Sequence, residues 1–212
     1  MVPVLHGYWR SGTSYRTRIA LELKGLAYEH VGHDLRKGEQ RSEAYLALNP
    51  QGLVPALEVE QGVLTQSPAI LEWIEERWPE PPLLPPEPFA RAEVRAMASL
   101  VACDIHPLNN LRVLKALRHD FGADDARIAA WAARWTTAGF DALERAIERH
   151  GQGWAWGDAP TFADCALIPQ VYSARRFEVD LTPYPRILAV DARAAGHAAF
   201  QAAHPDRQPD AD

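Results

Sequence analysis

The first stretch of the chain whose residue types and spacing can do chemistry is a run of small hydroxyl residues. It reads Ser11-Gly12-Thr13-Ser14 and lies between a short apolar segment and an apolar run with helical spacing. The first-turn amides of a helix have no partners within the helix, and the helix dipole is positive there. With hydroxyl donors added, such a turn would hold a thiolate or carboxylate and favour its charged form. The alternative is structural, because Ser14 or Thr13 can simply cap the helix.

The turn itself brings no thiol. In thioredoxin-like folds the turn between the first strand and the first helix often carries a C-x-x-C pair, but Ser11 and Ser14 stand at those places. The two cysteines, Cys103 and Cys165, lie in helix-patterned segments and are expected to be small buried hydrophobic side chains. Any sulfur that reacts at this turn must therefore come from a ligand.

Two further segments offer backbone or capping groups to a ligand. Val54 precedes Pro55 at the entry to an expected strand, so the bond between them is a candidate cis peptide and the Val54 backbone can pair with a peptide. The alternative is a trans bond at an edge strand. Farther on, Ser67 is expected to be an N-cap with Pro68 at the first helical position. Capping explains both of these residues but leaves Gln66 without a structural reason.

The helix-patterned second half carries a polar cluster around Pro107, which must interrupt the helix. Its members are Asp104, His106, Asn109, Asn110 and Arg112, and in a helix His106 and Asn110 would share a face. A lone helical histidine is more often a bystander than a catalyst, so the cluster favours function only modestly.

Near the end of a later helix stand Arg175 and Arg176, where the helix dipole favours cations in any case. One of the two can instead provide a guanidinium fork for a substrate carboxylate. Thr161 and Asp164 form a variant of the capping box, which we interpret as a folding signal.

Short strand-like and helix-like segments alternate in the part of the chain that carries the hydroxyl turn. We expect strands in residues 3–8, 28–35, 54–60 and 62–66, and helices at about 14–24, 42–48 and 68–77. This order is a βαβ unit followed by a hairpin and a helix.

Residues 78–88 contain six prolines and cannot continue a helix or a central strand. They predict a domain boundary, with one domain at residues 1–78, a proline-rich linker at 79–88 and an all-α domain at 89–212. The expected helices of the second domain span residues 89–118, 125–150, 163–176 and 185–202. The polar tail at 204–212 is expected to fray.

The composition excludes several classes of protein. With 212 residues, 47% hydrophobic and 24% charged, the chain is typical of a soluble globular protein. A net charge of -6 argues against a general nucleic-acid binder. No apolar stretch is long enough to span a membrane and no signal peptide is evident, so a cytoplasmic location is expected. No zinc site or other metal site is expected either.

Taken together, these segments resemble the glutathione transferases, and the zeta class in particular. The likeness is carried by RSGTSYRTRIAL, LNPQGLVPAL, QSPAILEWI, IHPLNNLRVLK, GDAPTFADC, ARRFEVDLTPYPRI and FQAAHPDRQPD. These stretches cover nearly the whole chain, and the turn and the R-F-x-V-D-L-x-P-Y-P run are specific to the class. The resemblance implies the glutathione-transferase architecture, with a thioredoxin-like domain followed by a helical one.

The resemblance also implies glutathione as the cofactor and assigns its contacts. In the first domain they would be Ser11, Gly12 and Thr13 at the thiol, Gln40 and the Val54 backbone along the peptide, and Gln66 and Ser67 at the γ-glutamyl end. In the second domain they would be His106, Asn110 and Arg112. Members of the class usually form homodimers, and Asp104 would reach the glutathione amine of the neighbouring subunit.

Class members are glutathione-dependent cis-trans isomerases of maleylacetoacetate or maleylpyruvate in aromatic catabolism. The implied mechanism is addition of the glutathione thiolate to the cis double bond, rotation and elimination, with Arg10 and Arg176 holding the carboxylates of a small dicarboxylate substrate and the developing enolate. Many members have cysteine in the turn, which is absent here. His106 replaces a common glutamine and Arg112 a small polar residue, and these cations favour maleylpyruvate slightly.

Two alternatives stay open at this point. One is a transferase that conjugates glutathione to electrophiles or dehalogenates small haloacids, since the turn supports both chemistries. The other is a catalytically idle interaction protein, which loss of Ser11, Gln66 and Ser67 would have favoured; all three are present.

Overall fold

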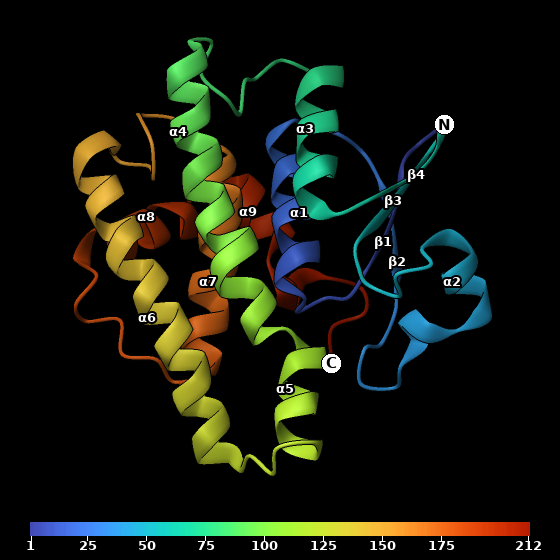
Figure 1. Cartoon of the computed structure of the whole chain (residues 1–212). Coiled ribbons are helices and arrows are strands. Elements are labelled where there is room, and N and C mark those ends of the chain that lie inside the picture. Colours follow the sequence, from blue (N-terminus) through green and yellow to red (C-terminus); the bar gives the residue numbers. More distant parts are fainter. The chain divides into compact units, whose positions relative to one another are not determined.

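A mixed four-stranded sheet forms the centre of the first of two units in the computed structural model, which describes all 212 residues (Figure 1). Its strands are β1 (Val4–Gly7), β2 (Glu29–Gly32), β3 (Ala56–Val59) and β4 (Gly62–Thr65). The order is β2-β1-β3-β4, with β1 parallel to β2 and the other two pairs antiparallel. The structure confirms the predicted βαβ unit and hairpin of a thioredoxin-like sheet.

Helices cover both faces of this sheet. Helices α1 (Gly12–Leu23) and α3 (Ser67–Arg77) lie side by side on one face, and the short α2 (Glu43–Leu48) lies on the other (Figure 1). In the core of this unit, Leu5 of β1, Leu57 of β3 and Ile70 of α3 are fully buried. Helix α1 is therefore held from several sides, which fixes the direction of its N-terminus.

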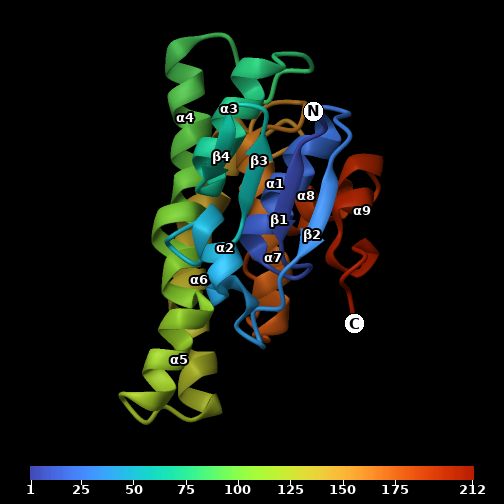
Figure 2. The same cartoon turned by 90° about the vertical axis from the view of Figure 1, so that its right-hand side faces the viewer.

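The end of the chain belongs to the same unit, which comprises residues 1–83 and 196–212. Helix α9 (Ala198–Ala203) packs on α1, and the following tail runs beside β2 (Figure 2). We expected residues 196–212 to belong to the helical domain and the tail to fray. Instead, the tail is held by His30 of β2, which contacts Gln208, and by the backbone N–H of Trp9, which donates to Asp210.

The second unit, residues 84–195, contains helices and no named strand. Its helices are α4 (Pro88–Ser99), α5 (Leu111–His119), α6 (Asp125–His150), α7 (Phe162–Arg176) and α8 (Pro185–Ala195). The predicted capping box at the start of α7 is confirmed, with Asp164 fully buried. No helix of the chain is both long enough and apolar enough to cross a membrane.

Two predicted helices are broken in the structure. The stretch 89–118 passes through a π-helical turn (Leu100–Ile105) and a 3-10 turn (His106–Asn109), because Pro107 lacks the N–H that a continuous helix needs. The π-helical turn packs closely on α6, where a Cβ at Gly139 would lie 2.3 Å from the Ile105 side chain. The stretch 185–202 is broken after Ala195, and α9 starts at Ala198.

Candidate active site

The hydroxyl turn after β1 is the N-terminus of α1, as the sequence indicates. Ser11 is the N-cap, and its Oγ accepts the N–H of Ser14 at 3.4 Å. The N–H groups of Gly12 and Thr13 belong to the first turn, where no helical carbonyl can accept them. Ser11, Gly12 and Thr13 are only half-buried, so the positive end of α1 is open to a ligand.

The hydroxyl protons of this turn can be placed from their partners. Thr13 donates its O–H to the carbonyl oxygen of Val54 at 2.9 Å. The Ser11 and Thr13 oxygens are 2.9 Å apart, and since the only hydroxyl proton of Thr13 is already used, Ser11 donates there. Ser11 is thus the hydroxyl that can turn toward a thiolate, while Thr13 offers its backbone N–H.

Ser14, which sequence reasoning treated as a possible cap, has a structural role. It is fully buried, and its Oγ accepts the N–H of Tyr8 at 3.3 Å. Ser14 therefore closes the turn from inside and is not exposed to a ligand.

The loop before β3 is attached to the turn. The Val54-Pro55 peptide bond is cis, and the Val54 carbonyl accepts the Thr13 hydroxyl. The preceding carbonyl, that of Leu53, accepts the Tyr45 hydroxyl at 2.6 Å and the Asn49 side-chain amide at 2.7 Å. Val54 is thus placed within reach of the same helix terminus as Ser11.

The start of α3 differs from the prediction. Ser67 is the first helical residue and not the N-cap, and its Oγ accepts a hydrogen bond of 3.4 Å from the buried guanidinium of Arg16. Gln66 is the cap and has a positive φ of 67°, an unfavourable region for a residue other than glycine. Strain of this kind is concentrated at ligand sites. The side chain of Gln66 also has a structural contact, because its Nε2 donates to Oε1 of Gln51 at 2.6 Å.

Two more side chains of the first unit were predicted to contact a ligand. Gln40 lies in a 3-10 turn (Glu39–Arg41), where its Oε1 is buried without a hydrogen-bond partner. Arg10 is half-buried, with its guanidinium carbon 5.9 Å from the Tyr8 ring centre and 5.4 Å from that of Trp9. Cation–π contacts of this kind hold the cation beside the turn.

The polar cluster of the second unit is arranged differently from a helix face. Asn110 is the N-cap of α5, and its side-chain oxygen accepts the N–H of Arg112 at 3.1 Å. His106 lies in the 3-10 turn, so the predicted common helical face with Asn110 is wrong. Asp104 and Cys103 are exposed in the π-helical turn, and the expectation that Cys103 is buried is also wrong. Cys165 is buried as predicted.

One member of the arginine pair at the end of α7 forms an ion pair. Arg175 reaches Asp191 of α8, with 2.5 Å between Nη2 and Oδ2. Arg175 therefore ties two helices of its own unit together. Arg176 stays the predicted contact of a substrate carboxylate, on the class resemblance alone.

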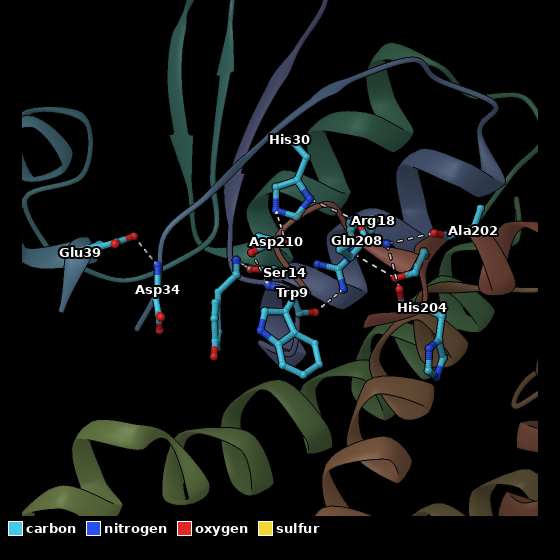
Figure 3. A network of polar contacts seen from close by, with 12 residues as sticks. Trp9, Ser14, Arg18, His30, Asp34, Glu39, Ala202, His204, Gln208 and Asp210 are labelled. Atoms are coloured by element: carbon cyan, nitrogen blue, oxygen red, sulfur yellow. Dashed lines mark hydrogen bonds and ion pairs between the residues drawn. The ribbon is translucent and has the colours of Figure 1, made fainter. Parts of the chain in front are cut away.

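Sequence reasoning missed residues whose partners are distant along the chain. Arg18 is fully buried and joins the turn to α9, and Asp210 of the tail bonds to the turn (Figure 3). Asn109 of the second unit belongs to the polar cluster that the sequence places around Pro107, but its bond to Thr136, at 3.4 Å, was not foreseen, and its Oδ1 is buried without a hydrogen-bond partner. The only signal for these contacts in the sequence was Arg18, an arginine within a helix-patterned run.

Comparisons with known proteins agree on one family. A model of the "Glutathione S-transferase, N-terminal domain" matches residues 10–77. A maleylpyruvate isomerase from a Ralstonia species is 55% identical over 208 residues, which are 97% of this chain and 98% of that protein. The maleylacetoacetate isomerase of Pseudomonas aeruginosa is 51% identical over 209 residues, 97% of each chain.

Solved structures give the same result. A holo structure of a maleylpyruvate isomerase, described as a bacterial zeta-class glutathione transferase, has a TM-score of 0.97 and 54% identity, covering 99% of this chain and 100% of that one. A maleylacetoacetate isomerase from Anaeromyxobacter dehalogenans, with glutathione bound in its active site, has a TM-score of 0.91 and 48% identity. That match covers 100% of this chain and 98% of the other.

Proposed function

The chain belongs to the zeta-class glutathione transferases, and on this basis we propose that it is a glutathione-dependent cis-trans isomerase acting on maleylpyruvate. The observation that carries the proposal is the Ser11 cap at the open N-terminus of α1, in a turn without a cysteine. A helix terminus with a hydroxyl donor lowers the pKa of a bound thiol. The reacting sulfur is then that of glutathione.

The reaction follows from this single nucleophile. Glutathione held by this turn would supply a thiolate for reversible addition to the cis double bond, which would allow rotation and give the trans isomer with no net change in protons or electrons. The Ser11 hydroxyl would assist both the addition and the loss of the thiolate by turning from Thr13 to the sulfur.

We assign the glutathione contacts of the first unit as the class resemblance implies. Ser11, Gly12 and Thr13 hold the thiol, Gln40 and the Val54 backbone hold the peptide, and Gln66 and Ser67 hold the γ-glutamyl group. The geometry supports the last pair, because Gln66 is strained and the Arg16 guanidinium adds positive charge at Ser67.

For the second unit we propose His106, Asn110 and Arg112 as further glutathione contacts. Arg10 and Arg176 bind the substrate carboxylates and the developing enolate. The protein acts as a homodimer in the cytoplasm, and Asp104 binds the glutathione amine of the partner subunit.

Maleylpyruvate is preferred to maleylacetoacetate for two reasons. The relative named for maleylpyruvate has the higher identity, 55% against 51%. The basic side chains His106 and Arg112 also suit a small dianion. The protein would then serve the gentisate pathway of aromatic degradation.

The test is the absorbance of maleylpyruvate, generated from gentisate by its dioxygenase, with purified protein and with or without glutathione. We expect conversion to fumarylpyruvate only when both protein and glutathione are present. Maleylacetoacetate, assayed in parallel, should give the lower kcat/KM. No conversion of either substrate, together with glutathione conjugation or dehalogenation of small haloacids, would contradict the proposal.

A further inference from the structure

The last nine residues, 204–212, form a strap along the first unit. The strap follows α9 and passes beside β2 (Figure 2), and its Asp210 side chain reaches the turn that precedes α1 (Figure 3). Ala211 packs against a buried cluster that contains Tyr8 and Trp9. The strap is therefore in contact with the residues directly before the Ser11 cap.

Asp210 makes the central contact of the strap. Its Oδ2 accepts the backbone N–H of Trp9 at 2.9 Å, and its Oδ1 lies 3.5 Å from Nε2 of His30 on β2. The strap approaches β2 so closely that a Cβ at Gly32 would lie 2.7 Å from the Asp210 Cβ. Glycine at position 32 is thus a condition for this contact.

The carbonyl of Trp9 is held from the same end of the chain. The fully buried Arg18 donates from Nη2 to the Trp9 oxygen at 2.7 Å and from Nε to the Ala203 oxygen at 2.9 Å. Both backbone polar groups of Trp9 are therefore bonded to the C-terminal segment, directly or through one guanidinium. We call the hydrogen bonds to the N–H and the carbonyl of Trp9 the clamp. Since Arg10 and Ser11 directly follow Trp9 in the chain, the clamp sets the position of their backbone.

The strap is itself fixed by hydrogen bonds. Gln208 is buried, and its Nε2 donates to the carbonyl oxygens of Ala202 at 3.0 Å and His204 at 2.9 Å. Its Oε1 lies 3.3 Å from Nδ1 of His30. His30 thus faces Gln208 with one ring nitrogen and Asp210 with the other, so the Asp210 carboxylate cannot shift without breaking this chain of contacts.

We propose that Asp210 is a positioning residue of the isomerase site, which acts through the Trp9 N–H to hold Arg10 and the Ser11 cap in their reactive places. The proposal rests on the proposed function for its activity readout. A catalytic group that moves by about 1 Å can lose a hundredfold in rate, so a bond one residue away from Arg10 is close enough to matter.

The test compares three variants with the wild type. Asp210→Ala removes the acceptor, whereas Asp210→Asn keeps one, because its amide oxygen can face Trp9 and its NH₂ group can face Nε2 of His30. Asp206→Asn is the matched control, since Asp206 lies exposed in the same strap and contacts only His204, at 3.7 Å. The readouts are kcat, KM for glutathione and the pKa of the bound glutathione thiol from thiolate absorbance.

We expect Asp210→Ala to lower kcat by about 10- to 100-fold and to raise the thiol pKa, since the Ser11 cap is no longer held in place. Asp210→Asn should restore both values, and Asp206→Asn should leave them unchanged. A purely stabilising strap would change the thermal midpoint and leave the kcat and the thiol pKa of folded Asp210→Ala at wild-type values, which would overturn the proposal.

A second variant covers the case in which Asp210→Ala does not fold. Gly32→Ala pushes on the Asp210 side chain without removing it and should show the same fall in kcat and rise in thiol pKa. Unchanged values in folded Gly32→Ala would refute the clamp. The thiol titration uses glutathione alone, so a wild type that binds glutathione but does not isomerise maleylpyruvate would refute the proposed function and still leave the clamp tested.

Discussion

Thr13 donates its hydroxyl proton to the carbonyl oxygen of Val54 at 2.9 Å, so the helix terminus and the loop before β3 are joined by one hydrogen bond. The bond decides the roles of two neighbouring hydroxyl groups. Thr13 cannot give the same proton to a ligand, while Ser11, which donates to Thr13, can redirect its own. The two side chains are therefore not equivalent in the proposed reaction.

This difference predicts unequal effects of removing the two hydroxyls. Ser11→Ala should lower kcat/KM for maleylpyruvate by about 100-fold and raise the pKa of the bound glutathione thiol, since a single donor to a developing anion has an effect of this size. Thr13→Val should raise the thiol pKa less, because its N–H is kept. Thr137→Val is the control, since that hydroxyl only bonds within α6. A larger rise in thiol pKa for Thr13→Val than for Ser11→Ala would contradict the assignment.

A buried ion pair fixes the segment that contains Pro81 and Leu83, and it gives a prediction about stability. Lys24 Nζ lies 2.6 Å from Glu75 Oε2 and also donates to the Pro81 carbonyl at 2.6 Å, while Glu75 accepts the N–H of Leu83. Glu75→Leu should therefore lower the free energy of unfolding by about 3–5 kcal/mol, because it leaves a buried ammonium without its counter-charge.

Chemical denaturation of variants checks this value. Lys24→Met combined with Glu75→Leu should recover much of the loss, since no buried charge is then left. Glu76→Gln, at the exposed next position, should change the free energy of unfolding by no more than about 0.5 kcal/mol. Equal losses in the single and double variants would show that the pair does not act as a unit.

The local parts of this structure were predictable, and the distant contacts were not. The helix start at the hydroxyl turn and the Thr161 capping box follow from rules that involve neighbouring residues, and both are found, although the N-cap is Ser11 and the expected cap at Ser14 or Thr13 is wrong. The bond from Trp9 to Asp210 spans 201 positions, and no periodicity reports such a pairing. The tail looked disordered because its composition is polar, but its polar side chains are the ones that bond to β2 and the turn.

The second unit shows the same limit. Pro107 predicts a break, yet proline alone does not say that a π-helical turn precedes it or that Asn110 caps the next helix. The ion pair of Arg175 likewise depends on the position of Asp191 on another helix. Tertiary packing decides these details.

Histidines near the strap predict how stability depends on pH. Burial lowers the pKa of His30 below its ordinary value of about 6.5, and Arg18 acts in the same direction, while Asp210 opposes them. Burial and then His6 lower the pKa of His33. Below about pH 6.5 the unfolded chain binds protons that the folded chain does not, so the free energy of unfolding falls until the folded-state pKa values are passed.

The matched variants are His30→Gln and, at an exposed position of α5, His119→Gln. His30→Gln should reduce the fall in unfolding free energy between about pH 7 and about pH 5, and His119→Gln should leave it unchanged. Burial raises the pKa of Asp164 to about 6, so its protonation increases the free energy of unfolding as the pH falls. This contribution is the same in all three proteins. A pH dependence that His30→Gln does not alter would be inconsistent with this origin.

The two arginines at the end of α7 should separate stability from substrate binding. Arg176→Ala should lower kcat/KM for maleylpyruvate by about 10- to 100-fold, the range expected when a charge-assisted hydrogen bond to a carboxylate is lost, and should leave the thiol pKa of bound glutathione unchanged. Arg176→Lys should recover only part of the rate, because an ammonium lacks the planar fork.

Arg175→Ala removes an ion pair in which the arginine is half-exposed, so it should cost at most about 1 kcal/mol of stability and leave kcat/KM unaltered. Steady-state kinetics at varied maleylpyruvate and saturating glutathione decides between them, and a kinetic defect in Arg175→Ala without one in Arg176→Ala would reverse the assignment.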